Sequence, residues 1–281
     1  MNPPPVLAYH KVGTPELGGT WCTVRQLRRQ LAALRTAGWA ALDLERFEAR
    51  LDAPLDSPPA AAADRAVLLT FDDAFESFAR HAWPELVRAG WGAVLFVVTS
   101  YVGGRSTWDL PLPGRRVRHL DWPALRELQR AGLGIGSHAA SHCDLRRLPD
   151  RELGAELAGS RCALEDRLGV AVRSVAYPFG RADARVQEAA RAAGYTLGFS
   201  MCPPRGRAGV DRLALRRHAV YCIDGPESVL DKVDPQRRLH AYQDRAERAI
   251  NACAAIAARR ARPAPPRADR PPDRDACDAG G

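Results

Sequence analysis

The stretch 66–73 reads Ala-Val-Leu-Leu-Thr-Phe-Asp-Asp, an apolar run that ends abruptly in two carboxylates. A continuous apolar run, rather than an alternating one, is typical of a strand buried on both faces, as in a parallel sheet covered by helices. A second such run, Ala-Val-Leu-Phe-Val-Val at 93–98, follows a helix predicted over 77–89. These two strands and the helix between them predict a β/α fold.

The same alternation continues along the chain on both sides of this unit. Further strands are predicted at 6–10, 133–137, 174–177, 195–199 and 213–221, with helices after Thr23 and over 122–131, 150–168 and 183–193. About seven such units favour a barrel over an open sheet, and both architectures place functional residues at the carboxyl ends of the strands. Two stretches, 52–65 and 101–119, are predicted to be surface loops because they are rich in turn residues.

The composition is that of a globular protein, with 281 residues, 46% hydrophobic residues and 26% charged residues. The formal charge is +8, but all except two of the 41 basic residues are arginine, which indicates a bias across the chain rather than a binding site. No apolar run approaches the roughly 20 residues of a membrane-spanning helix. No secretory signal is visible, so we expect a cytoplasmic protein, with an exported form as the alternative if the true start lies upstream. Seven cysteines without a Cys-x-x-Cys pair argue against a disulfide framework.

The chain is predicted to divide into a catalytic domain, 1–236, and a tail, 237–281. An alanine-rich helix is expected over 237–259, followed by a disordered segment rich in proline, arginine and aspartate. The tail carries ten arginines and six acidic residues. Because these charges are mixed and no aromatic residues alternate with the arginines, a nucleic-acid partner is not expected.

Asp72 and Asp73 follow a strand predicted to be buried, where two neighbouring carboxylates are costly to desolvate unless a cation compensates them. A pair of aspartates also suits a helix cap, which is the alternative for this motif alone. His138 and His142 follow another predicted strand, four residues apart. Histidine and carboxylate are ligands that suit zinc, and surface histidines are the alternative. The two motifs strengthen each other because both end strands of one predicted sheet.

A third motif, Tyr177-Pro178-Phe179-Gly180, follows the strand at 174–177. Proline and glycine favour a tight turn, which can present backbone N–H groups to a developing oxyanion. The order and spacing of the three motifs resemble the polysaccharide deacetylase family, the carbohydrate esterase family that includes the nodulation-type chitooligosaccharide deacetylases. The similarity extends over about 5–235 and includes the opening Val-Leu-Ala-Tyr-His-Lys-Val at 6–12.

This resemblance implies a distorted (β/α) barrel that binds a divalent metal ion, most plausibly Zn²⁺. The implied metal ligands are Asp73, His138 and His142. Asp72 would be the general base, and the Phe179 backbone N–H would stabilise the oxyanion. The general acid would be His218, with His10 as the rival candidate.

The chain also departs from the family pattern. Ala176 stands where many members have an arginine that contacts the catalytic aspartate, and we expect Arg217, or else Arg216 or Arg181, to replace it. The usual Asp-Trp motif after Tyr195 is missing. The remaining implied contacts are to substrate, from Tyr177, Pro178 and Leu145.

The leading functional hypothesis is a metal-dependent hydrolase that removes N-acetyl groups from an amino-sugar oligomer, polymer or glycoconjugate. The alternative is a carbohydrate-binding or assembly protein on the same fold, inactive because the arginine and the Asp-Trp motif have been lost. Acetate release separates the two hypotheses.

Overall fold

A computed structural model of the protein describes residues 3–13, 15–16, 19–52, 65–108, 117–201, 211–234 and 236–237. The strands are β1 (Val6–Tyr9), β2 (Lys11–Val12), β3 (Trp21–Cys22), β4 (Trp39–Leu42), β5 (Arg65–Phe71), β6 (Val94–Val97), β7 (Gly134–Ser137), β8 (Ser174–Ala176), β9 (Leu197–Ser200), β10 (Leu215–Arg216) and β11 (His218–Ala219). The α-helices are α1 (Val24–Thr36), α2 (Leu44–Asp52), α3 (Trp83–Ala89), α4 (Trp122–Arg130), α5 (Asp150–Leu168), α6 (Ala184–Ala192) and α7 (Pro226–Val233).

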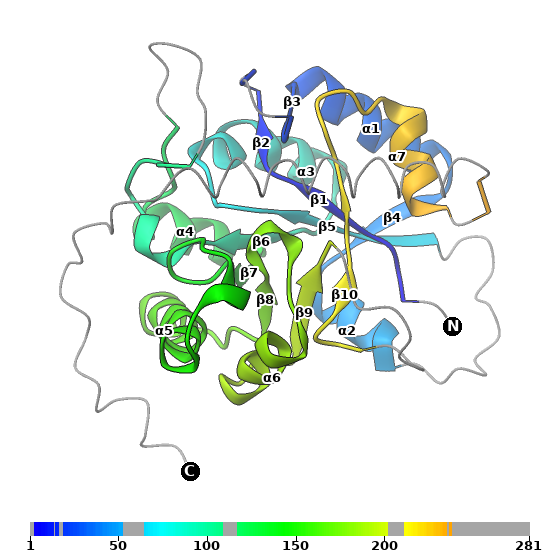
Figure 1. Ribbon diagram of the computed structural model, residues 1–281. Helices are drawn as coiled ribbons and strands as arrows, with labels where there is room; N and C mark the ends of the chain where they lie inside the picture. The colour runs from blue at the N-terminus through cyan, green and yellow to red at the C-terminus, as the bar shows by residue number, and fades with distance from the viewer. Residues whose placement is uncertain are drawn as a thin grey trace.

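The main sheet is parallel, and its strands follow the order β10-β9-β8-β7-β6-β5-β1-β11. Its two ends belong to one short stretch of chain, because β10 and β11 are separated only by Arg217. β10 pairs with β9, while β11 pairs with β1. The sheet therefore curls round into a nearly closed barrel, with the helices arranged outside it (Figure 1).

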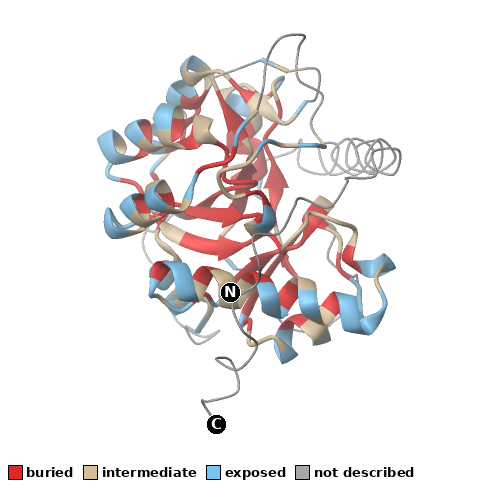
Figure 2. Ribbon diagram, turned by 90° about the vertical axis from the view of Figure 1, so that its left-hand side faces the viewer, coloured by how far each residue is buried: buried red, intermediate tan, exposed pale blue. Residues whose placement is uncertain are grey.

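Apolar side chains fill both faces of the sheet. One cluster, which includes Val6, Leu68, Phe96 and Phe199, lies on one face of the strands. A larger cluster packs the other face against the helices. Figure 2 shows the strands buried and the helices exposed on their outward sides. Burial on both faces is the reason that the strands read as continuous apolar runs.

Helix ends follow local signals in the sequence. Thr23 caps α1 in a capping box with Gln26, and Asp121 caps α4, whose first turn contains Pro123. Gly90 and Gly169 end α3 and α5 in the left-handed conformation. The helices then pack in neighbouring groups, with α1 against α7 and α5 against α4 and α6 (Figure 1).

The predicted strands and helices of the main sheet are present, with several differences. The helix predicted over 77–89 begins with a π-helical segment, Phe78–Ala82, before α3. The single strand predicted at 213–221 is two short strands. The sequence pattern did not reveal β4, α2 or α7. β4 pairs with the first half of β5, and β6 pairs with the second half. β5 therefore has two neighbouring strands along one edge.

Several sequence expectations lie almost wholly outside the described residues: the helix and tail at 237–281, of which only Arg237 is described, and most of the loop at 52–65. The expectation that the chain divides at 236 stays a prediction. Within the described part of the chain, no helix is long and apolar enough to cross a membrane.

Gly136 in β7 lies in tightly packed surroundings, two residues before His138. A Cβ atom at this position would meet Phe96 Cε1 at 2.4 Å and Ser174 Oγ at 2.6 Å. We expect Gly136→Ala to lower the free energy of unfolding by about 1–3 kcal/mol through overpacking. Urea denaturation measures this change.

Gly159 provides the matched control because it is exposed in the middle of α5, and a Cβ atom added there would meet no other atom within 4 Å. Gly159→Ala is expected to raise the free energy of unfolding by about 0.5–1 kcal/mol, since alanine loses less backbone entropy on folding. Equal effects of the two substitutions would contradict this account of the packing around β7.

Candidate functional site

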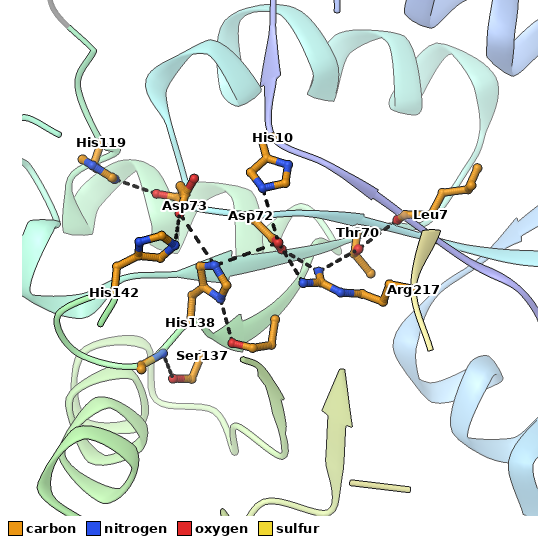
Figure 3. A network of polar contacts seen from close by, with 12 residues as sticks. Leu7, His10, Thr70, Asp72, Asp73, His119, Ser137, His138, His142 and Arg217 are labelled. Carbon is orange, nitrogen blue, oxygen red and sulfur yellow. Dashed lines mark hydrogen bonds and ion pairs between the residues drawn. The ribbon is translucent and has the colours of Figure 1, made fainter. Parts of the chain in front are cut away.

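The three predicted motifs meet at the carboxyl ends of β5, β7 and β8. Figure 3 shows Asp72 and Asp73 facing His138 and His142, with His10 on one side and Arg217 on the other. Asp72 continues the ladder of β5, since its N–H donates to the Tyr9 carbonyl. The parallel strands thus gather side chains that are far apart in the sequence.

The backbone explains how two adjacent aspartates reach one site. In an extended strand, neighbouring side chains point to opposite faces. Here the chain turns directly after Asp72, because Asp73 and Ala74 have φ angles of 71° and 51°. This left-handed turn allows the Asp73 carboxylate to face the same site as Asp72.

Asp73, His138 and His142 form a group whose ligand atoms all lie within 4.8 Å of one another. Asp73 Oδ1 is 3.7 Å from His138 Nε2 and 3.5 Å from His142 Nε2. Two ligand atoms each about 2.1 Å from a tetrahedral zinc ion lie about 3.4 Å apart. The donor types and their spacing therefore fit a divalent metal ion of the zinc class, with other coordination positions left for water and substrate.

The protonation of the two histidines also suits metal binding. His138 Nδ1 is 2.7 Å from the Ala176 carbonyl oxygen, so it carries the hydrogen and Nε2 keeps its lone pair toward Asp73. Burial lowers the pKa of both His138 and His142 below the usual value for histidine. Neutral imidazole is the form that binds metals.

The loop that carries these histidines is anchored by Glu156 of α5. One carboxylate oxygen of Glu156 accepts hydrogen bonds from the backbone N–H groups of Ala140 and Ser141, both at 2.9 Å. The loop needs such support because Ala139 and His142 have positive φ angles, 61° and 56°. Glu156 was not predicted from the sequence, because it lies on a neighbouring helix and belongs to none of the motifs.

Asp72 forms a bidentate ion pair with Arg217. Arg217 Nη1 donates to Asp72 Oδ1 at 2.6 Å, and Nη2 donates to Oδ2 at 2.8 Å. Arg217 also donates to the Thr70 hydroxyl, which in turn donates to the Leu7 carbonyl. The predicted contact between Arg217 and Asp72 is thus present, although Arg217 comes from the other end of the sheet.

Charge determines the protonation state of Asp72. Burial by itself would raise the pKa of this carboxyl group, but the Arg217 guanidinium, His138 and His10 favour its charged form. Together they hold the pKa well below its usual range. The carboxylate is therefore ionised throughout the physiological pH range.

His10 directly follows β1, and His218 is the first residue of β11, the strand that pairs with β1. His10 Nε2 is 3.8 Å from Asp72 Oδ2, and burial lowers the pKa of His10 to about 4. His218 pairs in register with Leu7, whose side chain packs between the sheet and the helices. The choice between His218 and His10 as general acid stays a prediction, although the printed contact with Asp72 is that of His10.

The turn at Tyr177-Pro178-Phe179-Gly180 lies beside the histidines. Phe179 has a φ angle of 59°, and its ring centroid is 4.8 Å from that of His142. Tyr177 is fully buried, and its hydroxyl donates to the Leu213 carbonyl. Its side chain is therefore part of the core, and its predicted contact with substrate stays a prediction.

The other two predicted substrate contacts, Pro178 and Leu145, are also buried. Leu145 is 1% exposed and belongs to the large core cluster between sheet and helices. The predicted contacts of Pro178 and Leu145 with substrate stay predictions.

Two aromatic residues beside the site were not predicted. Trp108 stacks on His142, and His119 Nδ1 is 2.6 Å from the Asp73 carbonyl oxygen. Both belong to the region 101–119, which reads as a surface excursion because of its glycine, arginine and proline content. No periodic signal marks them, since they reach the site through loops.

Comparisons with known proteins agree with this geometry. The family model of polysaccharide deacetylases matches residues 60–198. The polysaccharide deacetylase homologue YxkH of Bacillus subtilis is 25% identical over 223 residues, which cover 79% of this chain and 72% of YxkH.

Solved structures show the same fold. The deacetylase PplD of Streptococcus pyogenes, in complex with acetate, has a TM-score of 0.69 at 22% identity, covering 82% of this chain and 98% of PplD. IcaB from Ammonifex degensii has a TM-score of 0.64 at 25% identity, covering 85% of this chain and 96% of IcaB. The nearly closed parallel barrel, the motifs at its strand ends and these matches together place the chain in the polysaccharide deacetylase family.

Proposed function

We propose that this deacetylase is a metal-dependent hydrolase that removes N-acetyl groups from an amino-sugar oligosaccharide, polysaccharide or glycoconjugate. The observation that carries the proposal is the juxtaposition of two differently supported carboxylates. Asp73 faces two histidines, while Asp72, its neighbour in sequence, is bound by Arg217. Family membership supports deacetylation, and this site supplies a chemical route to it.

Asp73, His138 and His142 would hold the metal ion. A divalent ion at this place lowers the pKa of a water molecule and polarises the acetamide carbonyl group. Asp72 then has one task, to remove a proton as the water oxygen bonds to the carbonyl carbon. Its low pKa makes it a weak base, but it is always ionised, and Arg217 fixes the direction of both oxygens.

The remaining steps concern the oxyanion and the leaving group. The backbone N–H of Phe179, in the strained turn beside His142, is proposed to donate to the oxygen on which negative charge develops. When the C–N bond breaks, the sugar nitrogen must gain a proton. His10 is proposed to carry the proton from Asp72 to that nitrogen, and the 3.8 Å between its Nε2 and Asp72 Oδ2 supports the first part of this transfer.

The alternative, a carbohydrate-binding protein without activity, loses much of its support. It depended in part on the absence of an arginine at Ala176. Arg217 provides a guanidinium that binds both oxygens of Asp72, so the catalytic aspartate is not left without its partner.

Replacement of Asp72 tests the proposed base. We expect Asp72→Asn to reduce acetate release by about 10²–10⁴-fold while the bound metal remains, because the amide cannot accept the proton. The assay measures acetate across N-acetylated oligosaccharides and nucleotide sugars. Asp150→Asn, at an exposed carboxylate on α5, is the control and should retain full activity. Unchanged acetate release by Asp72→Asn would refute the proposed role.

Removal of a ligand tests the metal site. We expect elemental analysis to find close to one equivalent of divalent metal in the wild-type protein, and Asp73→Ala to lose it together with activity. Three ligands hold zinc tightly, and two hold it much less well. Asp72→Asn is the matched control, since it changes the adjacent carboxylate but should retain the metal. A wild-type protein that is active after complete chelation would contradict the proposal.

The buried histidines predict how the stability of the metal-free protein depends on pH. The pKa of His10 is about 4 in the folded protein, against about 6.5 when unfolded, so the folded state binds fewer protons. Stability should therefore fall as pH drops from about 6.5 to about 4, by about 3 kcal/mol for His10 alone. His138 and His142 act in the same direction, whereas protonation of Asp72 reduces stability only at lower pH.

Urea denaturation of the metal-free protein across this range measures the slope. His10→Gln should make the slope shallower, because one buried titratable ring is removed. A slope that is identical in wild type and His10→Gln would show that His10 does not titrate in this way.

A further inference from the structure

The two histidines of the proposed metal site are held in different ways. His138 is fixed by the hydrogen bond from Nδ1 to the Ala176 carbonyl. The Nδ1 atom of His142 is also buried, but no described residue forms a hydrogen bond with it. A histidine that binds a metal usually donates its second nitrogen to a carbonyl or carboxylate, which fixes the ring. Something else must therefore orient His142.

The ring of His142 contacts two aromatic side chains, those of Trp108 and Phe179. The rings of Trp108 and His142 have centroids 4.4 Å apart and an interplanar angle of 18°, which is a stacked arrangement. Phe179 contacts the imidazole with a centroid distance of 4.8 Å and an angle of 57°. Stacking restricts rotation of the imidazole because turning the ring would break the contact with the indole.

The indole of Trp108 also contacts other aromatic rings. The ring of Tyr101 meets it edge-on at 4.6 Å, and the ring of His119 lies at 5.3 Å. The Tyr101 side chain is buried, and its hydroxyl shares a hydrogen bond of 2.8 Å with Thr107, next to Trp108. His119 in turn contacts the backbone carbonyl of Asp73 at 2.6 Å. The indole is thus connected to the loops of two proposed ligands.

We propose that Trp108 is a positioning residue, which holds the His142 imidazole by stacking so that Nε2 faces Asp73 Oδ1. Stacking here does what the hydrogen bond to Ala176 does for His138. The inference rests on the proposed metal site but goes beyond it, since it assigns a role to a tryptophan in the loop between β6 and α4. It also explains how a buried imidazole is oriented when its second nitrogen has no partner among the described residues.

Two substitutions of similar bulk separate stacking from space filling. Trp108→Phe keeps an aromatic face against His142. Trp108→Leu keeps apolar volume at this position but removes the aromatic face. With Zn²⁺ alone and a competing chelator, we expect Trp108→Leu in the full chain to bind zinc about 10-fold more weakly, the scale seen when outer support of a ligand is lost. Trp108→Phe should recover most of the affinity.

The absorption spectrum of the Co²⁺-substituted protein gives a second readout, because it reports the ligand geometry and not the overall stability. It should change in Trp108→Leu and resemble wild type in Trp108→Phe. Trp122→Leu is the control, since this half-buried tryptophan lies on α4 and packs against the core, outside the ligand group. It should alter neither zinc affinity nor the spectrum.

The outcomes distinguish this inference from the proposed function. A wild-type chain that binds no zinc would refute the metal site itself. If wild type binds zinc and Trp108→Leu binds it equally well with an unchanged Co²⁺ spectrum, only the role of Trp108 is overturned. Equal losses in Trp108→Leu and Trp108→Phe would also overturn it, because the aromatic face would then be irrelevant.

Discussion

The ion pair between Arg217 and Asp72 is the interaction on which the site depends. Both side chains are almost completely buried, and an isolated charge in such surroundings would be very costly. The guanidinium binds both carboxylate oxygens and is held in turn by Thr70, so each charge is compensated. Removal of either partner would leave the other charge buried and unpaired, which is why the pair constrains everything around it.

This pair also links the two ends of the sheet. Asp72 ends β5 in the middle of the strand order, and Arg217 lies between β10 and β11, where the barrel nearly closes. The guanidinium reaches Asp72 only because β11 pairs with β1, which in turn pairs with β5. The strand pairing that nearly closes the barrel therefore also brings the positive charge of Arg217 to the proposed base, Asp72.

Strained backbone conformations are concentrated in the loops that carry the proposed metal ligands and Phe179. Apart from glycines, the described residues with positive φ angles are Asp73, Ala74, Ala139, His142 and Phe179. All of them follow β5, β7 or β8, and such conformations persist only where the surroundings enforce them. Glu156 supplies hydrogen bonds to one of these loops, and the aromatic rings of Trp108 and Phe179 contact His142. Rigid support of this kind suits a site that must keep three ligand atoms close together.

Local patterns in the sequence were enough to predict the parallel β/α architecture and the residues at its strand ends. Apolar runs report burial on both faces, and Asp72, Asp73, His138 and His142 stand out because each follows such a run. The sequence also predicted Arg217 as the partner of Asp72, as the first of three candidate arginines. Short elements such as β4 and α7 could not be predicted, because their stability comes from neighbours rather than from their own periodicity.

Only the tertiary structure determined which side chains lie close to the site and in which direction they point. The fold brought His10 beside Asp72, although the resemblance to the family named His218 first and His10 as its rival. Packing buried Tyr177 and Leu145 in the core, and loops brought Trp108 and Glu156 to the histidines. The physical reason is that a sequence pattern records which residues are buried or polar. The direction of a side chain is determined only when pairing across the barrel fixes the register of each strand.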